Sequence, residues 1–201
     1  MLTIIGKSTS INVRKVLWTC AELDIPYERR DWQENDAPLN PNRMVPVLVD
    51  GDFVLWESHA ICRYLCHSYG GATLLPATSD AQARARVEQW MDWQATELNT
   101  AWRYPFMALV RGSAAHRDPA QIEAGIAAWN RHVGLLDAQL ARTGAYVAGD
   151  AFSLADIVLG LSVNRWRMTP MARPDYPHVA AWYARMAGRP GFDAWCDNGV
   201  A

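Results

Sequence analysis

The segment from Lys7 to Asn12 carries three hydroxyl side chains and one amide directly before a stretch of helical periodicity. The N-terminus of a helix offers free N–H groups and the positive end of the helix dipole, so it favours an anion. A free thiol titrates near pH ~8.5, and only a few per cent of it is thiolate at neutral pH. Ser10 could stabilise that thiolate, with Asn12 as a second polar contact. The alternative is that Ser10 only caps the helix, because Ser is a preferred N-cap residue.

Val45-Pro46 opens a run of β-forming residues that ends at Val49. Because Pro has no N–H to give to a sheet ladder, it lies at a strand edge or a turn. A cis Val45-Pro46 bond would turn the backbone N–H and C=O of Val45 outward, free to pair with an extended peptide. Most X-Pro bonds are trans, so the sequence leaves both isomers open.

Glu57-Ser58 stands where the next helical pattern begins. Ser58 and the helix N-terminus suit a carboxylate, and Glu57 suits an ammonium group. The pair could therefore hold the zwitterionic end of an α-amino acid. A simple helix-capping pair is the alternative.

A possible metal site is formed by His59, Cys62 and Cys66, which fall on one helical face with His67 adjacent. Zinc uses such ligands, but structural zinc sites draw on two separated ligand pairs, and the chain offers no second pair. We therefore expect these side chains to pack against a sheet, and we expect no metal.

The elements that must position these residues alternate between strand and helix over the first 75 residues. The patterns predict a βαβ unit followed by an antiparallel hairpin and a helix: Leu2–Ile5, Asn12–Leu23, Tyr27–Trp32, Val45–Val49, Phe53–Leu55, and a helix from Glu57 to about Gly70. The loop before the first helix then lies at the carboxyl edge of the sheet, where such folds bind ligands. A Pro- and Asn-rich loop at 37–42 precedes the hairpin.

From Asp80 onward the sequence predicts only helices. Val87 to Trp102 reads as one long amphipathic helix that Pro105 should kink. Asp118-Pro119 starts a second helix that Gly144 closes, and Ser153 with Asp156 forms a capping box. With 70–80 as a linker, we expect two domains, residues 1–75 and 76–201.

Composition excludes several classes of protein. The net charge of −2 over 201 residues argues against a nucleic-acid partner. The sequence contains no apolar run long enough to cross a membrane and no signal peptide at its start, so we expect a cytoplasmic protein without a membrane partner. Four cysteines do not make a disulfide framework. The ten Trp suit helix interfaces or an apolar pocket.

Taken in order, the motifs resemble the glutathione transferase family over nearly the whole chain, and specifically its serine-type, theta-like and phi-like bacterial members. The segments that carry the resemblance are Ser10–Val16, Asn40–Leu48, Leu55–Leu65, Trp90–Trp93, Val147–Ile157 and Arg189–Phe192. The resemblance implies a thioredoxin-like N-terminal domain, an all-helical C-terminal domain and a homodimer. It also implies an enzyme that conjugates or dehalogenates small electrophiles with the thiolate of glutathione as co-substrate.

Residue roles follow from the same resemblance. Ser10 matches the activating serine, although Ser8 and Thr9 are neighbouring hydroxyls that could meet the sulfur instead. The glutathione-binding residues implied are Thr9, Arg43, Val45, Pro46, Glu57 and Ser58. Many relatives carry Gly-Lys before the Val-Pro, where this chain has Arg43-Met44. The cation for the glycyl carboxylate has therefore either moved to Arg43 or is missing.

The electrophile pocket is expected at the end of the long helix. The candidates are Trp102, Arg103, Phe106, Arg111 and, from another face, Trp166. A cation at Arg103 or Arg111 would favour an anionic substrate such as a haloacid. Two other functions stay open. One is a glutathione-dependent thiol or peroxide reductase, which would normally need a cysteine at position 10; the other is a binding module of the same fold without catalysis.

Overall fold

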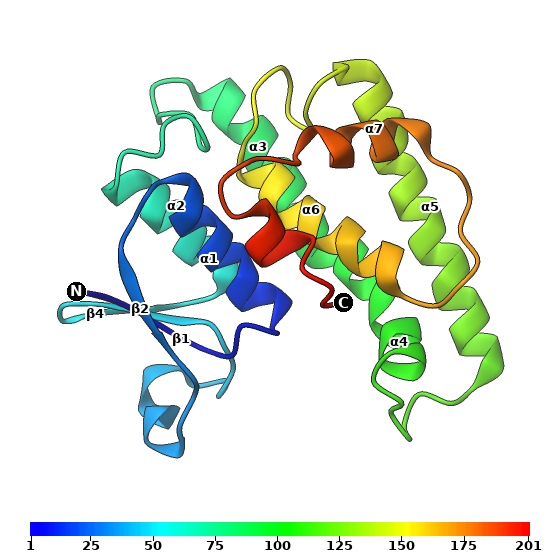
Figure 1. Ribbon diagram of the computed structural model, residues 1–201, viewed down its shortest axis with the longest axis horizontal. Helices are drawn as coiled ribbons and strands as arrows, with labels where there is room; N and C mark the ends of the chain where they lie inside the picture. Colours follow the sequence, from blue (N-terminus) through cyan, green and yellow to red (C-terminus); the bar gives the residue numbers. More distant parts are fainter.

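The N-terminal part of the chain is a four-stranded mixed sheet with helices packed on it (Figure 1). The computed structural model describes residues 1–201. The elements of this part are β1 Leu2–Ile5, α1 Ile11–Glu22, β2 Tyr27–Arg30, the 3-10 helix η1 Glu34–Leu39, β3 Val47–Asp50, β4 Phe53–Trp56 and α2 Ser58–Ser68. The strands stand in the order β2-β1-β3-β4.

The register of the sheet confirms the predicted βαβ unit and hairpin. β1 runs parallel to β2, with Leu2 opposite Tyr27, and antiparallel to β3, with Ile4 opposite Leu48. β3 and β4 form the antiparallel hairpin. This arrangement is the thioredoxin-like fold expected from the sequence. The Pro- and Asn-rich loop differs from expectation only in that part of it forms η1.

The C-terminal part contains only helices and short helical turns. They are α3 Ala81–Trp93, the π-helical turn η2 Gln94–Leu98, α4 Asn99–Leu109, α5 Pro119–Thr143, α6 Leu154–Met168, α7 Pro177–Arg185 and the π-helical turn η3 Phe192–Cys196. The prediction of a single long helix from Val87 is therefore wrong, because the helix is not continuous. The regular helix is interrupted at η2, whereas Pro105 lies inside α4. A π-turn arises where side-chain packing shifts the hydrogen-bond register, which periodicity does not reveal.

The predicted helix ends are confirmed. The side chain of Asp118 accepts a hydrogen bond from the N–H of Ala120, and Gly144 closes α5 in the left-handed conformation at φ +72°. Ser153 and Asp156 form the expected capping box at the start of α6. These signals depend only on local backbone geometry, so short sequence patterns reveal them.

Two central helices, α1 and α6, join the parts of the molecule. Both are buried on nearly all sides, because α1 packs on α2 and on α6, while α6 also packs on α3. Trp18 of α1 is fully buried at this contact. A Cβ on Gly160 of α6 would lie 3.2 Å from the Trp18 ring, so glycine permits this close approach. None of the helices combines the length and the apolar character needed to cross a lipid bilayer.

Candidate active site

Ser10 stands immediately before α1, at the N-cap position. Its hydroxyl accepts no hydrogen bond from the helix, although its carbonyl accepts one from the N–H of Arg14 at 2.9 Å. The N–H of Ser10 donates to the carbonyl of Lys7 at 3.0 Å, which closes a turn around Ser8 and Thr9. Ser10 is half-buried and Thr9 is exposed. The Ser10 hydroxyl is thus not used as a helix cap and is free for a ligand.

Val45 lies beside the end of β1, and the Val45-Pro46 bond is cis. Val45 belongs to no strand, and neither its N–H nor its C=O has a hydrogen-bond partner in the protein. Gly6 makes room for this segment: at φ +146°, a Cβ there would lie 2.5 Å from Val13 and 2.9 Å from Val45. The backbone of Val45 therefore offers a donor and an acceptor to an extended peptide, as one strand does to another.

Glu57 and Ser58 lie at the junction of β4 and α2. Glu57 adopts φ +72°, an uncommon conformation for a residue with a side chain. Its exposed carboxylate makes no hydrogen bond or ion pair with the protein. Ser58 is buried as the first residue of α2, where the N–H groups of the first turn have no partner within the helix. The pair thus offers an anion to one ligand group and helix N–H donors to another.

A groove of about 370 Å³ brings most of these residues together. It is lined by Asn12, Asn40, Asn42, Met44, Val45, Pro46, Glu57 and Ser58. Five of the predicted site residues therefore share one cavity. Ser10 and Thr9 are not among its lining residues; they precede Asn12 in the turn before α1.

Arg43, the proposed cation for a carboxylate, does not line the groove. It is exposed, adopts φ +53°, and pairs with Glu34 at 3.0 Å. Asn40 was not singled out from the sequence, yet it holds this loop. Its side chain donates to the carbonyl of Met44 at 2.9 Å and accepts from the N–H of Asn42 at 2.9 Å. Its position in a Pro- and Asn-rich loop was the available signal, since Asn side chains often close such turns.

A buried polar chain runs from α1 beneath the groove into the helical part. Nζ of Lys15 lies 3.0 Å from Nε2 of His59 and donates to Oε1 of Gln94 at 2.8 Å. Gln94, in the π-turn, donates in turn to Oγ of Ser162 at 3.0 Å. Burial lowers the pKa of Lys15 to about 7, and it also lowers the pKa of His59. Because His59 follows Ser58, this chain ties the groove to the helical part.

Lys15 makes stability depend on pH. In the unfolded chain its pKa is near ~10.4, so between pH ~7 and ~10 the unfolded state binds more protons on this group than the folded state does. The free energy of unfolding contributed by Lys15 should therefore rise with pH, by at most about 1.4 kcal/mol per unit. We expect the difference in stability between wild type and Lys15→Met to grow in favour of wild type from pH ~7 to ~9.

Urea unfolding of both proteins at several pH values measures this difference. Subtracting the two curves removes the contribution of the cysteines and tyrosines that both proteins share. A difference that stays constant over this range would show that Lys15 keeps its ordinary pKa when folded.

The predicted electrophile residues are brought together only in part. Trp102 and Phe106 of α4 pack edge-to-face, with ring centroids 5.4 Å apart. The exposed Arg111 lies over Phe106 at 5.4 Å. Arg103 is exposed and makes no side-chain hydrogen bond or ion pair. Arg165, which was not singled out, joins the group: its guanidinium lies 4.4 Å from the Trp102 ring and 4.1 Å from the Phe106 ring. The sequence offered little signal, because α6 has two Arg residues in its last turn, Arg165 and Arg167, and only the packing shows which one is buried.

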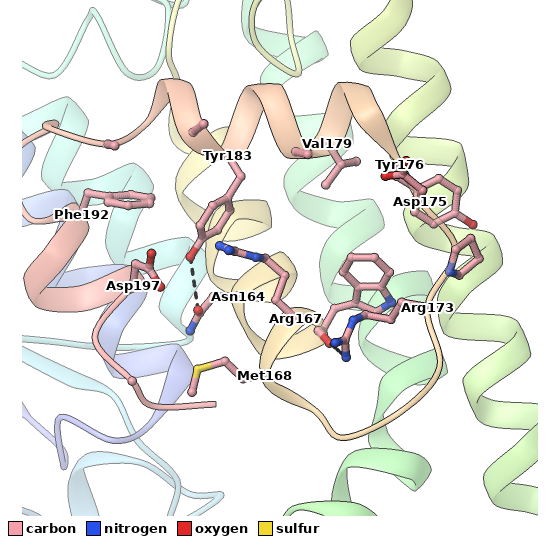
Figure 2. A pocket seen from close by; sticks show the side chains of 16 residues that line it. Asn164, Arg167, Met168, Arg173, Asp175, Tyr176, Val179, Tyr183, Phe192 and Asp197 are labelled. Carbon is pink, nitrogen blue, oxygen red and sulfur yellow. Dashed lines mark hydrogen bonds between the residues drawn. The ribbon is translucent and has the colours of Figure 1, made fainter.

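Trp166 lies apart from this group. Its indole N–H donates to Oδ1 of Asn130 at 2.8 Å, and the residue lines a different cavity of about 850 Å³. Figure 2 shows this cavity between α6, α7 and the C-terminal residues, where the hydroxyl of Tyr183 donates to Asn164 at 3.2 Å. It contains none of the groove residues. The groove, although smaller, gathers the convergent polar groups that mark a binding site.

The four cysteines are free, buried and unsuited to redox chemistry. Burial raises the pKa of Cys20 to about 12 and that of Cys62 to about 11, so their thiols stay protonated at neutral pH. Cys62 accepts a hydrogen bond from Thr19, and His59 contacts Lys15. No three His, Cys, Asp or Glu side chains are grouped closely enough to hold a metal ion.

Comparisons with known proteins agree with this geometry. The family profile "Glutathione S-transferase, N-terminal domain" matches residues 4–73, and "Glutathione S-transferase, C-terminal domain" matches residues 119–185. The chain is 37% identical to glutathione S-transferase GstB of Escherichia coli K12, over 94% of this chain and 95% of that protein. It is 29% identical to dichloromethane dehalogenase of Methylorubrum extorquens, over 84% of this chain and 65% of the relative.

Solved structures give the same result. The theta class glutathione S-transferase of Xanthomonas axonopodis pv. citri with glutathione bound matches with a TM-score of 0.89 and 35% identity, covering 100% of this chain and 99% of the other. Fold, groove, family profiles and whole-chain identity therefore converge. The chain belongs to the glutathione S-transferase family and is a transferase that conjugates glutathione with electrophiles.

Proposed function

We propose that glutathione lies extended in the groove, with its thiolate held by Ser10 and the N-terminus of α1. The observation that carries this proposal is a set of unused groups, two in the groove and one in the turn that precedes its lining residue Asn12. The Ser10 hydroxyl, the backbone of Val45 and the carboxylate of Glu57 have no partner within the protein. Unused donors and acceptors of this kind are what a peptide ligand satisfies.

Each end of glutathione has a matching partner. The γ-glutamyl ammonium pairs with Glu57, and its carboxylate accepts from Ser58 and the first N–H groups of α2. The cysteinyl unit pairs with the backbone of Val45 beside Pro46, and Thr9 lies alongside Ser10. Arg43 serves the glycyl carboxylate if it leaves Glu34, with which it forms an exposed ion pair of small energy.

The chemical step is a nucleophilic displacement. The thiol loses its proton to solvent, and the Ser10 hydroxyl and the dipole of α1 stabilise the sulfur anion. The sulfur then attacks the electrophilic carbon, the new C–S bond forms, and the leaving group departs with the bonding electron pair. Trp102, Phe106 and Arg111 of the helical domain line the approach of the electrophile. Arg103 is exposed on the same helix, and Trp166 lines the separate cavity between α6 and α7. We place the domain boundary near residue 75, within the linker between α2 and α3.

Glu57→Gln tests how the γ-glutamyl end is held. The change keeps the size of the side chain and removes its charge, so we expect glutathione affinity to fall about tenfold, the effect of one charge-assisted hydrogen bond. An analogue that lacks the α-amino group should bind wild type and variant equally. Isothermal titration calorimetry measures both ligands, with the exposed hairpin residue Asp52→Asn as control. An equal loss for both ligands would contradict this assignment.

The chain is further proposed to form a homodimer in the cytoplasm, where it removes reactive electrophiles. Met44, Phe53 and Val54 are exposed apolar residues on the hairpin and the loop before it, and β4 is an edge strand. Such a surface is typical of a protein interface. Four free cysteines fit a reducing compartment.

A further inference from the structure

Arg165 of α6 is a buried cation without an acceptor. Arg165 is only 3% exposed, and its guanidinium forms no hydrogen bond and no ion pair with any residue. Its Nε is completely enclosed. Burying a charge without a partner costs roughly several kcal/mol. An unpartnered buried guanidinium therefore calls for an explanation.

The aromatic rings around Arg165 hold it in place without satisfying it. The guanidinium packs on the Trp102 and Phe106 rings of α4, at 4.4 and 4.1 Å from their centroids. These cation–π contacts fix the orientation of the guanidinium, but the rings offer no oxygen that could accept its N–H groups. The indole N–H of Trp102 is likewise buried without an acceptor. The site therefore contains several N–H donors and lacks an oxygen to receive them.

The two charged side chains that act on Arg165 are both cations. Arg14 and Arg111 both lower its pKa, after the larger effect of burial, to about 9. Arg14, of α1, donates only to the neutral oxygens of Trp195, Asn198 and Val200, and its Nε and Nη2 are buried without partners. No carboxylate of the protein forms an ion pair with Arg14, Arg111 or Arg165, which we call the cation cluster.

The cation cluster lies on the side of the molecule where α1 begins. Arg14 is one helical turn beyond Ser10, whose carbonyl its N–H contacts at 2.9 Å. α6 packs on α1, and Arg165 near its C-terminal end reaches the Trp102 and Phe106 rings of α4 (Figure 1). Arg14 thus connects the cluster to the start of α1, one helical turn from the hydroxyl proposed to hold the sulfur of glutathione.

We infer that Arg165 binds a carboxylate of the second substrate, so that the enzyme prefers small electrophiles that carry an acid group beside the reacting carbon. This inference rests on the proposed glutathione groove. A carboxylate supplies two oxygens in the geometry that a guanidinium fork matches, and it neutralises the cluster. With a 2-halo acid the thiolate sulfur bonds to the carbon, the carbon–halogen bond breaks, and halide leaves with the electron pair.

Two adducts of glutathione test the inference by binding alone. S-carboxymethylglutathione and S-carbamoylmethylglutathione have nearly the same shape, but only the first adds a carboxylate. We expect calorimetry to show that wild type binds the carboxymethyl adduct at least about tenfold more tightly, as a charge-assisted pair predicts. Arg165→Met should abolish this preference and leave the affinity for the amide adduct unchanged.

Turnover with iodoacetate and iodoacetamide provides the second measurement, because both lose iodide. Arg165→Met should lower kcat/KM for iodoacetate about 10- to 100-fold and change that for iodoacetamide less than about threefold. Arg165→Lys should restore part of the preference, since it keeps the charge but lacks the fork. Arg131→Met, which removes an exposed charge from α5, is the matched control.

The outcomes separate the two proposals. If wild type binds both adducts equally, Arg165 does not bind the carboxylate. If Arg165→Met slows the reaction of both iodo compounds equally, Arg165 also does not bind the carboxylate, and its role would instead be to stabilise the thiolate. If wild type binds neither adduct nor glutathione, the proposal that the groove binds glutathione is wrong. Should Arg165→Met fail to fold, the preference of wild type and the Arg165→Lys variant decide the question.

Discussion

Replacing Ser10 with Ala is expected to lower kcat at neutral pH about 10- to 100-fold while glutathione affinity stays nearly unchanged. A hydrogen bond to a charged group contributes about 1.5–3 kcal/mol. Because about 1.36 kcal/mol equals one pKa unit, losing that bond should raise the pKa of the bound thiol by roughly one to two units. Less of the bound glutathione is then thiolate at pH ~7, whereas the groups that bind the peptide are untouched.

The pH profile of kcat distinguishes this role from a structural one. The midpoint of the profile should move to higher pH in Ser10→Ala, and the two enzymes should approach the same rate once the thiol is fully ionised. The fold should be unaffected, since the Ser10 hydroxyl makes no hydrogen bond within the protein.

Ser8→Ala and Thr9→Ala are the matched controls for the neighbouring hydroxyls, and neither should move the profile. Ser10→Thr, which keeps a hydroxyl, should retain most of the activity. A wild-type rate in Ser10→Ala would transfer the role to Thr9, Asn12 or backbone donors. A rate that falls equally at every pH would rule out thiolate stabilisation as the cause.

Asp156→Ala is expected to lower the free energy of unfolding by about 3–5 kcal/mol, the largest loss of stability foreseen for a single polar substitution here. Asp156 is fully buried. Its Oδ1 accepts from the N–H of Val147 at 2.9 Å and from the indole of Trp182 at 2.8 Å. Its Oδ2 accepts from the N–H and the hydroxyl of Ser153 at 2.9 and 3.0 Å. Alanine would leave these four donors without an acceptor at the core.

Urea unfolding followed by Trp fluorescence measures this loss, and a shift in Tm of about 10 °C should accompany it. The nearby Asp150 is exposed and makes no side-chain hydrogen bond, so Asp150→Ala is the matched control and should change stability by less than about 0.5 kcal/mol. A loss in Asp156→Ala no larger than that of the control would show that the capping box is not a major source of stability.

Most of the fold could be predicted because its signals are local. The change from strand to helical periodicity gave the βαβ and ββα units, and caps such as Asp118 and Ser153 marked helix starts to within a residue. The π-turn at Gln94–Leu98 was not foreseen, because a shift in hydrogen-bond register depends on what the helix packs against.

The residues of the site also divide into those predicted from local sequence and those that only the tertiary structure reveals. The sequence by itself determined the family and the groove segments around Asn12, Val45 and Glu57, since each follows from residue type at an element boundary. Only the tertiary structure decided which distant side chains meet. It buried Lys15 against His59 and Gln94, separated Trp166 from Trp102, and enclosed Arg165 between two rings of α4. The physical reason is that burial and charge at one residue are set by helices packed against it from far along the chain, which the spacing along one helix does not encode.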